Sequence, residues 1–420
     1  MNKNSLLKGN RIPFLDNIRT LMVVLVLIFH AGAAYSSAVD FWPFHERSSS
    51  GLIDFYMLLG DVFMMSTLFF IAGYFAMPSY NKRGGRGFLK DKFKILGIPW
   101  LVITVLILPI IDYINYIFNL SDGLIGTSFG QYWLLSMKKI LEFNFGFLDM
   151  SKYIGMPDQY YQRYMWFLSL LLLFFIIFVF YMWIKNKMFK EVKMKENKNQ
   201  SKGVAFAIVS ILTVILFGTV KLFVYDEILG SGWFSFGHIL EFQLGKFMIY
   251  SVYFTFGIYA YTRGWFTSAG NIGRPWMWGI GCYVLFGANM LVFKVINSSD
   301  APFLIYKVLH VVLYPFWILS FLGVFLAFGY KYWNKSTLFN STISNNSYNM
   351  YLVHYFFAMI IPLTLSGWIS GPVIIKFIIT AVTTILASYA ISRFVIKKYP
   401  NIFIGVIVVC TVLLAILTNI

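Results

Sequence analysis

The chain has 420 residues and a net charge of +17; 59% of its residues are hydrophobic and only 12% are charged. Soluble domains carry about 25% charged residues, so this composition excludes a soluble enzyme with a membrane anchor and predicts a polytopic membrane protein. Basic loops that orient membrane helices explain the positive charge, and we expect no nucleic-acid partner. The cysteines, Cys282 and Cys410, lie in apolar runs, and no Cys or His spacing predicts a metal site.

Eleven hydrophobic stretches are long enough to cross a bilayer, which takes about 20 residues. They lie near 18–40, 53–77, 95–118, 163–184, 203–225, 244–262, 275–295, 303–330, 347–368, 372–393 and 401–419. We therefore predict an all-α integral membrane protein, a bundle of about 10–11 transmembrane helices formed by one polytopic domain, residues 1–420. The stretch at about 185–202 is predicted to be a basic linker, and 401–419 an additional C-terminal span.

Positive charge gathers on alternate connections between these stretches. The second connection carries six bases against Asp91, and the fourth carries seven lysines against two glutamates. The positive-inside rule then places the N-terminus in the cytoplasm and predicts a multi-pass protein of the cell membrane, surrounded by lipids. AGAAYSSA after the first apolar run is also compatible with signal-peptide cleavage, an alternative that would remove His30.

Arg19 and His30 lie eleven residues apart in the first hydrophobic stretch. Eleven residues return a helix to within roughly 20° of its starting direction and advance it by roughly 16 Å, so both side chains share one face. An ionisable side chain inside a membrane span is a functional-site hypothesis by default. The alternative is a structural histidine whose ring bonds a backbone carbonyl.

Seven segments in order resemble the membrane-bound acyltransferase 3 family, particularly its glucan biosynthesis protein C-like branch. They are PFLDNIRTLMVVLVLIFH at 13–30, FFIAGYF at 69–75, FLKDKFKILGIPW at 88–100, YMWFLSLLLLF at 164–174, FTFGIYAYTRGW at 254–265, SYNMYLVH at 347–354 and SYAISRFVIKKYPNIFIG at 388–405. The family's usual motifs are altered here at four places: at Met64, at Ala72, at Tyr164, and in a basic pair that is lysine-based here, at Lys90, Lys92 and Lys94.

The resemblance implies an O-acyltransferase. Such proteins move an acyl group, acetyl or succinyl most often, from a cytoplasmic acyl-CoA to a hydroxyl of an envelope glycan or related carbohydrate acceptor. The family's essential Arg and His correspond to Arg19 and His30. On physical grounds alone, a transporter of a glycan or small metabolite would also place charges within many spans, although no internal repeat is visible.

We predict His30 as the catalytic base, since imidazole titrates near neutral pH. Asp61, in the second span, is predicted to orient the His30 ring; the alternative is a carboxylate that faces water. His354 is predicted to line the donor channel or to bond a neighbouring helix. Basic residues are predicted to bind the phosphates of the donor, with plain loop topology as the alternative: Arg19, Arg86, Lys90, Lys92 and Lys94.

Three residues are predicted to contact the acceptor: Glu241, Trp166 and Tyr164. Sugars can stack on aromatic rings, but an interfacial aromatic belt explains the same residues, and Glu241 could be a simple interface residue. The long connection at about 119–162 is the expected place for an acceptor site, because long ordered loops are usually functional. The sequence leaves the oligomeric state open.

Overall fold

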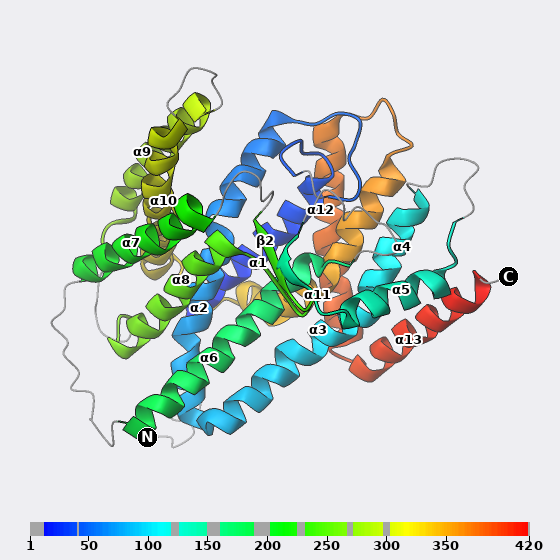
Figure 1. Ribbon diagram of the computed structural model, residues 1–420, viewed down its shortest axis with the longest axis horizontal. Helices are drawn as coiled ribbons and strands as arrows, with labels where there is room; N and C mark the ends of the chain where they lie inside the picture. The colour runs from blue at the N-terminus through cyan, green and yellow to red at the C-terminus, as the bar shows by residue number, and fades with distance from the viewer. Residues whose placement is uncertain are drawn as a thin grey trace.

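The computed structural model describes residues 12–39, 42–118, 126–148, 160–188, 202–224, 232–266, 272–296 and 303–418. It is an assembly of long helices with one small sheet (Figure 1). The helices are α1 (Pro13–Ala33), α2 (Gly51–Lys92), α3 (Ile98–Val102), α4 (Leu108–Phe118), α5 (Phe129–Leu141), α6 (Trp166–Met188), α7 (Lys202–Thr219), α8 (Leu244–Thr262), α9 (Pro275–Ile296), α10 (Phe303–Tyr332), α11 (Leu338–Leu365), α12 (Val373–Ala390) and α13 (Pro400–Leu417).

Within these residues, nine helical runs are long and apolar enough to cross a membrane. One of them, Gly51–Phe118, contains two predicted spans: the helix is interrupted at Gly84, which has a φ of 67° that an L-residue rarely adopts. The predicted span at 244–262 is α8. The described residues therefore confirm an all-α, multi-pass membrane bundle.

The first helix differs from its expected position. The predicted span at 18–40 would continue for ten residues beyond His30, whereas α1 ends at Ala33. His30 therefore lies one turn from the end of the helix. The chain that follows does not continue as a helix: it folds back, and the backbone N–H of Glu46 donates to the carbonyl of Ala34 at 2.8 Å.

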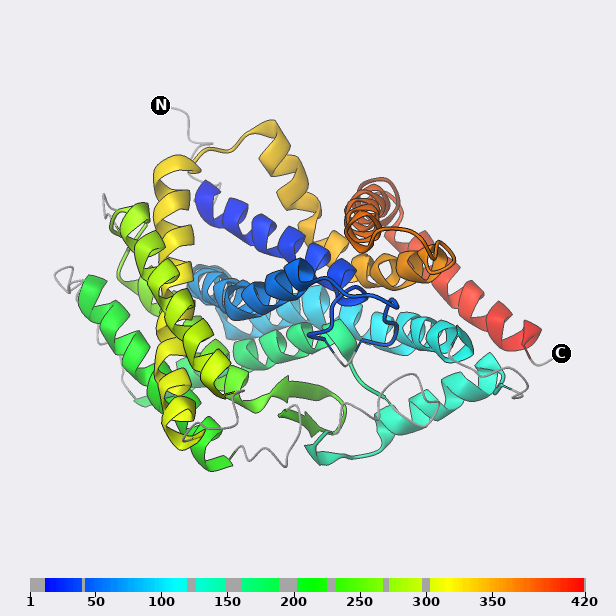
Figure 2. The ribbon, with the colours of Figure 1, turned by 90° about the horizontal axis from the view of Figure 1, so that it is seen from above.

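α1 is enclosed by other helices and contacts α2, α10, α11 and α12, as the view in Figure 2 shows. It runs parallel to α11. Arg19 contacts Ser344 near the beginning of both helices, and His30 contacts His354 further along both of them. The two residues of the predicted Arg–His pair thus each reach the same neighbouring helix.

α2 and α8 cross at very close range because each contributes a glycine to the contact. A Cβ atom added at Gly73 would lie 2.0 Å from the carbonyl oxygen of Phe254, and one at Gly257 would lie 2.0 Å from that of Phe70. Both distances are far below van der Waals contact. The small residues of the FFIAGYF motif therefore serve helix packing, which also sets the positions of the other residues on α2 and α8.

A three-stranded antiparallel sheet contributes Trp233 and Gln243 to the same cavity that Ala38 and Trp42 of the α1–α2 connection line. Its strands are β1 (Phe145–Phe147), β2 (Trp233–Phe236) and β3 (Leu240–Gln243), in that order. The long connection expected at 119–162 is thus partly regular: it contains α5 and β1, while 119–125 and 149–159 lie outside the described residues.

The predicted linker at about 185–202 begins inside a helix, because α6 continues to Met188. Its central part, 189–201, lies outside the described residues, and α7 begins at Lys202. The predicted C-terminal span corresponds to α13, which is largely exposed. The hydroxyl of Thr418, directly after α13, accepts a hydrogen bond of 2.9 Å from the backbone of Phe129 in α5.

Candidate active site

The site centres on two histidines that are 324 positions apart in the sequence. His30 Nδ1 on α1 lies 2.8 Å from His354 Nε2 on α11. His354 is completely buried, and its Nδ1 lies 2.6 Å from the carbonyl oxygen of Tyr351, one turn earlier on the same helix. Of the two predicted positions of His354, lining a channel or bonding a neighbouring helix, the structure shows the second: it bonds the histidine of α1.

The hydrogen-bond partners define which ring nitrogens carry protons. A carbonyl oxygen only accepts, so His354 Nδ1 must donate its proton to Tyr351. In the neutral ring, His354 Nε2 is then an acceptor, and the proton between the two rings belongs to His30 Nδ1. His30 Nε2 is left without a proton and is available to accept one. This is the arrangement of a general base held by an orienting partner.

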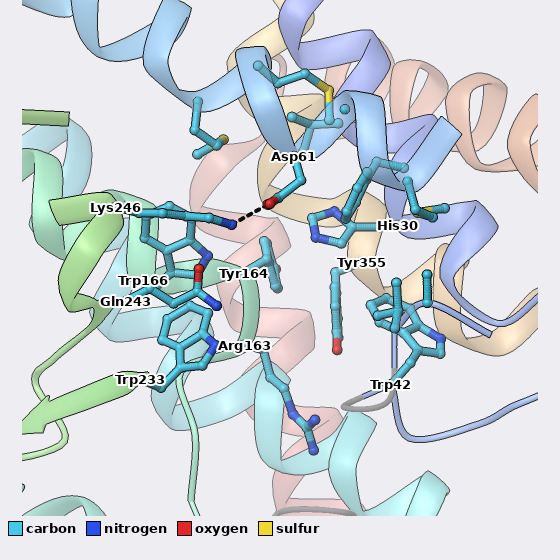
Figure 3. A pocket seen from close by; sticks show the side chains of 18 of the residues that line it. His30, Trp42, Asp61, Arg163, Tyr164, Trp166, Trp233, Gln243, Lys246 and Tyr355 are labelled. Atoms are coloured by element: carbon cyan, nitrogen blue, oxygen red, sulfur yellow. Dashed lines mark hydrogen bonds and ion pairs between the residues drawn. The ribbon is translucent and has the colours of Figure 1, made fainter. Parts of the chain in front are cut away.

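His30 borders a cavity of about 340 Å³, a size typical of small-ligand sites. Figure 3 shows that the side chains around it come from several elements. His354 is not among the lining residues, so it lies behind His30. His354 therefore contacts His30 from the side away from the cavity, and His30 is the member of the pair that faces the cavity.

Aromatic rings hold His30 in place on the side toward α11 and the α1–α2 connection. Trp42 stacks on His30 with ring centroids 5.8 Å apart and an interplanar angle of 19°. Tyr355 meets it edge-on at 5.7 Å and stacks on Tyr164 at 4.6 Å. The Tyr164 hydroxyl donates to the carbonyl of Leu352 at 2.7 Å. Tyr164 thus lines the cavity, as expected of a substrate-contacting residue, and also braces α11.

Asp61 lines the same cavity, but the expected contact with His30 is wrong. Its carboxylate forms an ion pair with Lys246 on α8 (Figure 3). The reason is the close α2–α8 crossing, which brings these two residues together, while His30 Nδ1 already has His354 as its partner. Asp61 remains at the cavity wall, with its side chain 48% exposed.

Glu241 is also placed differently from its prediction as an acceptor contact. Its side chain is fully buried in β3 and does not line the cavity. One carboxylate oxygen accepts from the backbone N–H of Gln162 at 2.8 Å, and the other lies 3.2 Å from His238 Nδ1. Burial raises the pKa of the Glu241 carboxyl, and these two contacts oppose that shift. Glu241 therefore fixes the segment that leads into Tyr164.

Arg163 belongs to the cavity wall although the sequence gave no reason to select it. It is 6% exposed, forms an ion pair of 3.1 Å with the buried Asp112, and has a φ of 51°. A positive φ in a residue other than glycine is costly and typically occurs where the surroundings over-determine it. The only sequence feature that could have pointed to Arg163 is its partner Asp112, an acidic residue inside the third predicted span, which would need a buried cation.

The five basic residues predicted to bind the donor do not line this cavity. Arg19 lies 3.0 Å from Asp16 and 3.3 Å from the Ser344 hydroxyl, and Lys92 lies over the ring of Phe175 at 4.3 Å. Arg86, Lys90 and Lys94 lie around the interruption at Gly84, toward the end of α2 that is remote from Asp61. Among the described residues, no cluster of three His, Cys, Asp or Glu could hold a metal ion.

Comparison with known proteins agrees with this architecture. The family model for an acyltransferase domain, Acyl_transf_3, matches residues 12–393. Glucans biosynthesis protein C of Escherichia coli K12 is 24% identical over 376 residues, covering 85% of this chain and 86% of the relative. The protein of that name from strain SMS-3-5 matches with the same identity and coverage. No solved structure matches significantly. The chain belongs to the acyltransferase 3 family and is a multi-pass membrane acyltransferase that transfers groups other than aminoacyl groups.

Proposed function

We propose that this acyltransferase moves an acetyl or succinyl group from a cytoplasmic acyl-CoA to a hydroxyl of an envelope glycan. The observation that carries the proposal is the His30–His354 pair, which leaves an unprotonated nitrogen at the wall of a ligand-sized cavity. Glucan as the acceptor class is supported by the name of the relatives, glucans biosynthesis protein C.

In the proposed reaction, His30 Nε2 takes the proton of the acceptor hydroxyl as its oxygen attacks the thioester carbonyl. The resulting tetrahedral intermediate collapses by breaking its C–S bond. The departing sulfur receives the proton from His30, which returns to its neutral form and leaves an ester and a free thiol. His354 Nε2 accepts a hydrogen bond from the His30 Nδ1–H throughout, which holds the His30 imidazole in the required tautomer.

The donor is proposed to enter from the basic end of the bundle, where positive charge suits the phosphates of coenzyme A. Arg19 is proposed to anchor it, and its position supports this: it lies on the same helix as His30, roughly 16 Å away along the axis. A pantetheine arm is long enough to cover such a distance. The N-terminal end of α1 is then the cytoplasmic end, in accordance with the positive-inside rule.

The test uses the purified full-length protein in nanodiscs with acetyl-, succinyl- and longer acyl-CoA, with and without a glucan oligosaccharide. Thiol release and the mass of the oligosaccharide are measured together. We expect acceptor-dependent release and an ester on the oligosaccharide, both lost in His30→Ala. His310→Gln is the matched control, because this histidine on α10 does not line the cavity. A folded protein that acylates no oligosaccharide from any donor would contradict the proposal.

A further inference from the structure

The cavity has a second group of lining residues, away from the His30 pair. In Figure 3, Trp166, Trp233, Gln243 and Lys246 are drawn on one side, His30, Tyr355 and Trp42 on the other, and Tyr164 between them. Asp61, joined to Lys246, completes the group. We call Asp61, Trp166, Trp233, Gln243 and Lys246 the tryptophan half of the cavity.

Two indole rings form a corner in this half. Trp166 and Trp233 lie with centroids 5.8 Å apart and planes at 78°. Tyr250, which also lines the cavity, stacks on Trp166 with ring centroids 5.8 Å apart and planes at 20°. Trp233 is directly opposite Gln243 in the β2–β3 register, so the sheet places both side chains at the same wall. The corner is therefore rigid and combines flat apolar faces with an amide.

Trp233 also presents a hydrogen-bond donor that the described part of the chain leaves without an acceptor. Its side chain is 6% exposed, and its Nε1 has no partner there. A buried donor without an acceptor costs roughly 1–3 kcal/mol, and tryptophan N–H groups usually find a partner when they are buried. In the close view, this nitrogen is directed toward the cavity (Figure 3). An oxygen of a bound ligand would satisfy it.

The charges of the tryptophan half cancel. Asp61 and Lys246 are its only charged members, and they are paired with each other. Neither is free to balance the charge of an anionic ligand. Asp61 nevertheless retains carboxylate lone pairs that can accept from a hydroxyl. Flat apolar faces, a free N–H, an amide and a paired carboxylate together suit a ring that carries several neutral hydroxyls.

We propose that the tryptophan half binds a neutral sugar unit of the acyl acceptor, with the Trp233 N–H donating to a sugar oxygen and the Trp166 ring stacking on the sugar's apolar face. This inference rests on the proposed function and adds the residues that select the acceptor. The donor arm, which is extended and flexible, has no flat face for the corner to hold, so these residues are expected to leave donor binding unchanged.

The test compares Trp233→Phe, which keeps an aromatic ring but removes the N–H, with Trp166→Leu, which removes the stacking face. Trp317→Phe is the matched control, at a buried indole on α10 outside the cavity. Each variant is assayed in nanodiscs for the KM of a neutral gluco-oligosaccharide, the KM of acyl-CoA and thioester hydrolysis without acceptor. A uronic-acid oligosaccharide of the same length reports on the predicted preference for a neutral sugar.

We expect Trp233→Phe to raise the KM of the neutral oligosaccharide about fivefold to tenfold, in line with the loss of one hydrogen bond. Trp166→Leu should raise it at least as much, while the KM of acyl-CoA and the hydrolysis rate stay within twofold of the control. An unchanged acceptor KM in both variants, or wild-type preference for the uronic acid, would overturn the inference. Absence of thioester turnover in the wild type would instead contradict the proposed function, so the two failures are distinguishable.

Discussion

The cavity around His30 differs in how its residues are held from the basic region, which consists of Arg19, Arg86, Lys90, Lys92 and Lys94. In the cavity, side chains from distant parts of the sequence are fixed by buried contacts, such as His30 with His354 and Arg163 with Asp112. In the basic region, the ion pairs join sequence neighbours: Arg19 with Asp16, and Arg83 with Asp91.

This difference matches the two functions proposed for these regions, proton transfer and phosphate binding. A general base needs one tautomer and one orientation, which only a packed environment provides. A phosphate-binding region can act through charge alone, so flexible and partly exposed side chains suffice. We therefore expect substitutions in the cavity to lower kcat and those in the basic region to raise the KM of the donor.

The largest effect is expected from removing the base. His30→Ala should lower kcat for acyl transfer by about 10²–10⁴-fold, the usual range for a positioned general base. The measurement is the initial rate of ester formation in nanodiscs, with binding of acyl-CoA followed separately by calorimetry. Retention of more than a tenth of the wild-type rate, with normal donor binding, would show that His30 is not the base.

A smaller loss is expected from the positioning residue. His354→Leu should lower kcat by about 10²-fold, because His30 loses the acceptor that fixes its tautomer. His354→Gln retains a hydrogen-bond acceptor and should recover part of the rate, whereas a purely structural role would not distinguish the two variants. The pH dependence of kcat should also change in His354→Leu; an unchanged profile would count against the positioning role.

The α2–α8 crossing tests whether the cavity depends on close packing. Gly73→Ala places a methyl group against the carbonyl of Phe254 and should destabilise the protein by roughly 1–3 kcal/mol. Gly279→Ala, at a helical glycine with open space around it, is the control. Thermal unfolding in detergent measures both. Equal stability of the two variants would remove the packing explanation for the FFIAGYF motif.

In the basic region, Arg19→Ala should raise the KM of acyl-CoA about tenfold or more, the loss expected for a charge-assisted hydrogen bond. Arg19→Lys should recover only part of it, because lysine cannot bind phosphate bidentately. The KM of the glycan should not change. Thioester binding at the wild-type level in Arg19→Ala would rule out the anchoring role.

The smallest effect is expected from the exposed lysines. Lys90→Gln and Lys94→Gln should each change the KM of acyl-CoA by less than about threefold, and the change should disappear at high salt because exposed charges are screened. Steady-state kinetics at two ionic strengths measure this. A large, salt-independent rise in the KM of acyl-CoA in either variant would indicate that the lysine contacts the donor directly. The basic region would then resemble the cavity more closely than we expect.

Local sequence features were sufficient to predict most of the helices and part of the residues that line the site. Hydrophobic length located the spans because a bilayer demands about 20 apolar residues per helix. Helical periodicity put Arg19 and His30 on one face, and both reach α11 in the structure. Trp166 and Tyr164, two of the aromatic residues predicted to contact the acceptor, line the cavity. Their catalytic and binding roles stay predictions.

The partners of these residues were decided by the tertiary structure. Nothing local to Asp61 indicates that α8 crosses α2 at two glycines and supplies Lys246 as its partner. The burial of Glu241 follows from a three-stranded sheet whose strands come from two distant connections. By itself, the sequence determined which segments are helical and that Arg19 and His30 share one face of α1, because bilayer thickness and helical period act on neighbouring residues. Only the packing of α1 against α11 decided that His30 meets His354, because contacts between residues 324 positions apart depend on how whole helices fit together.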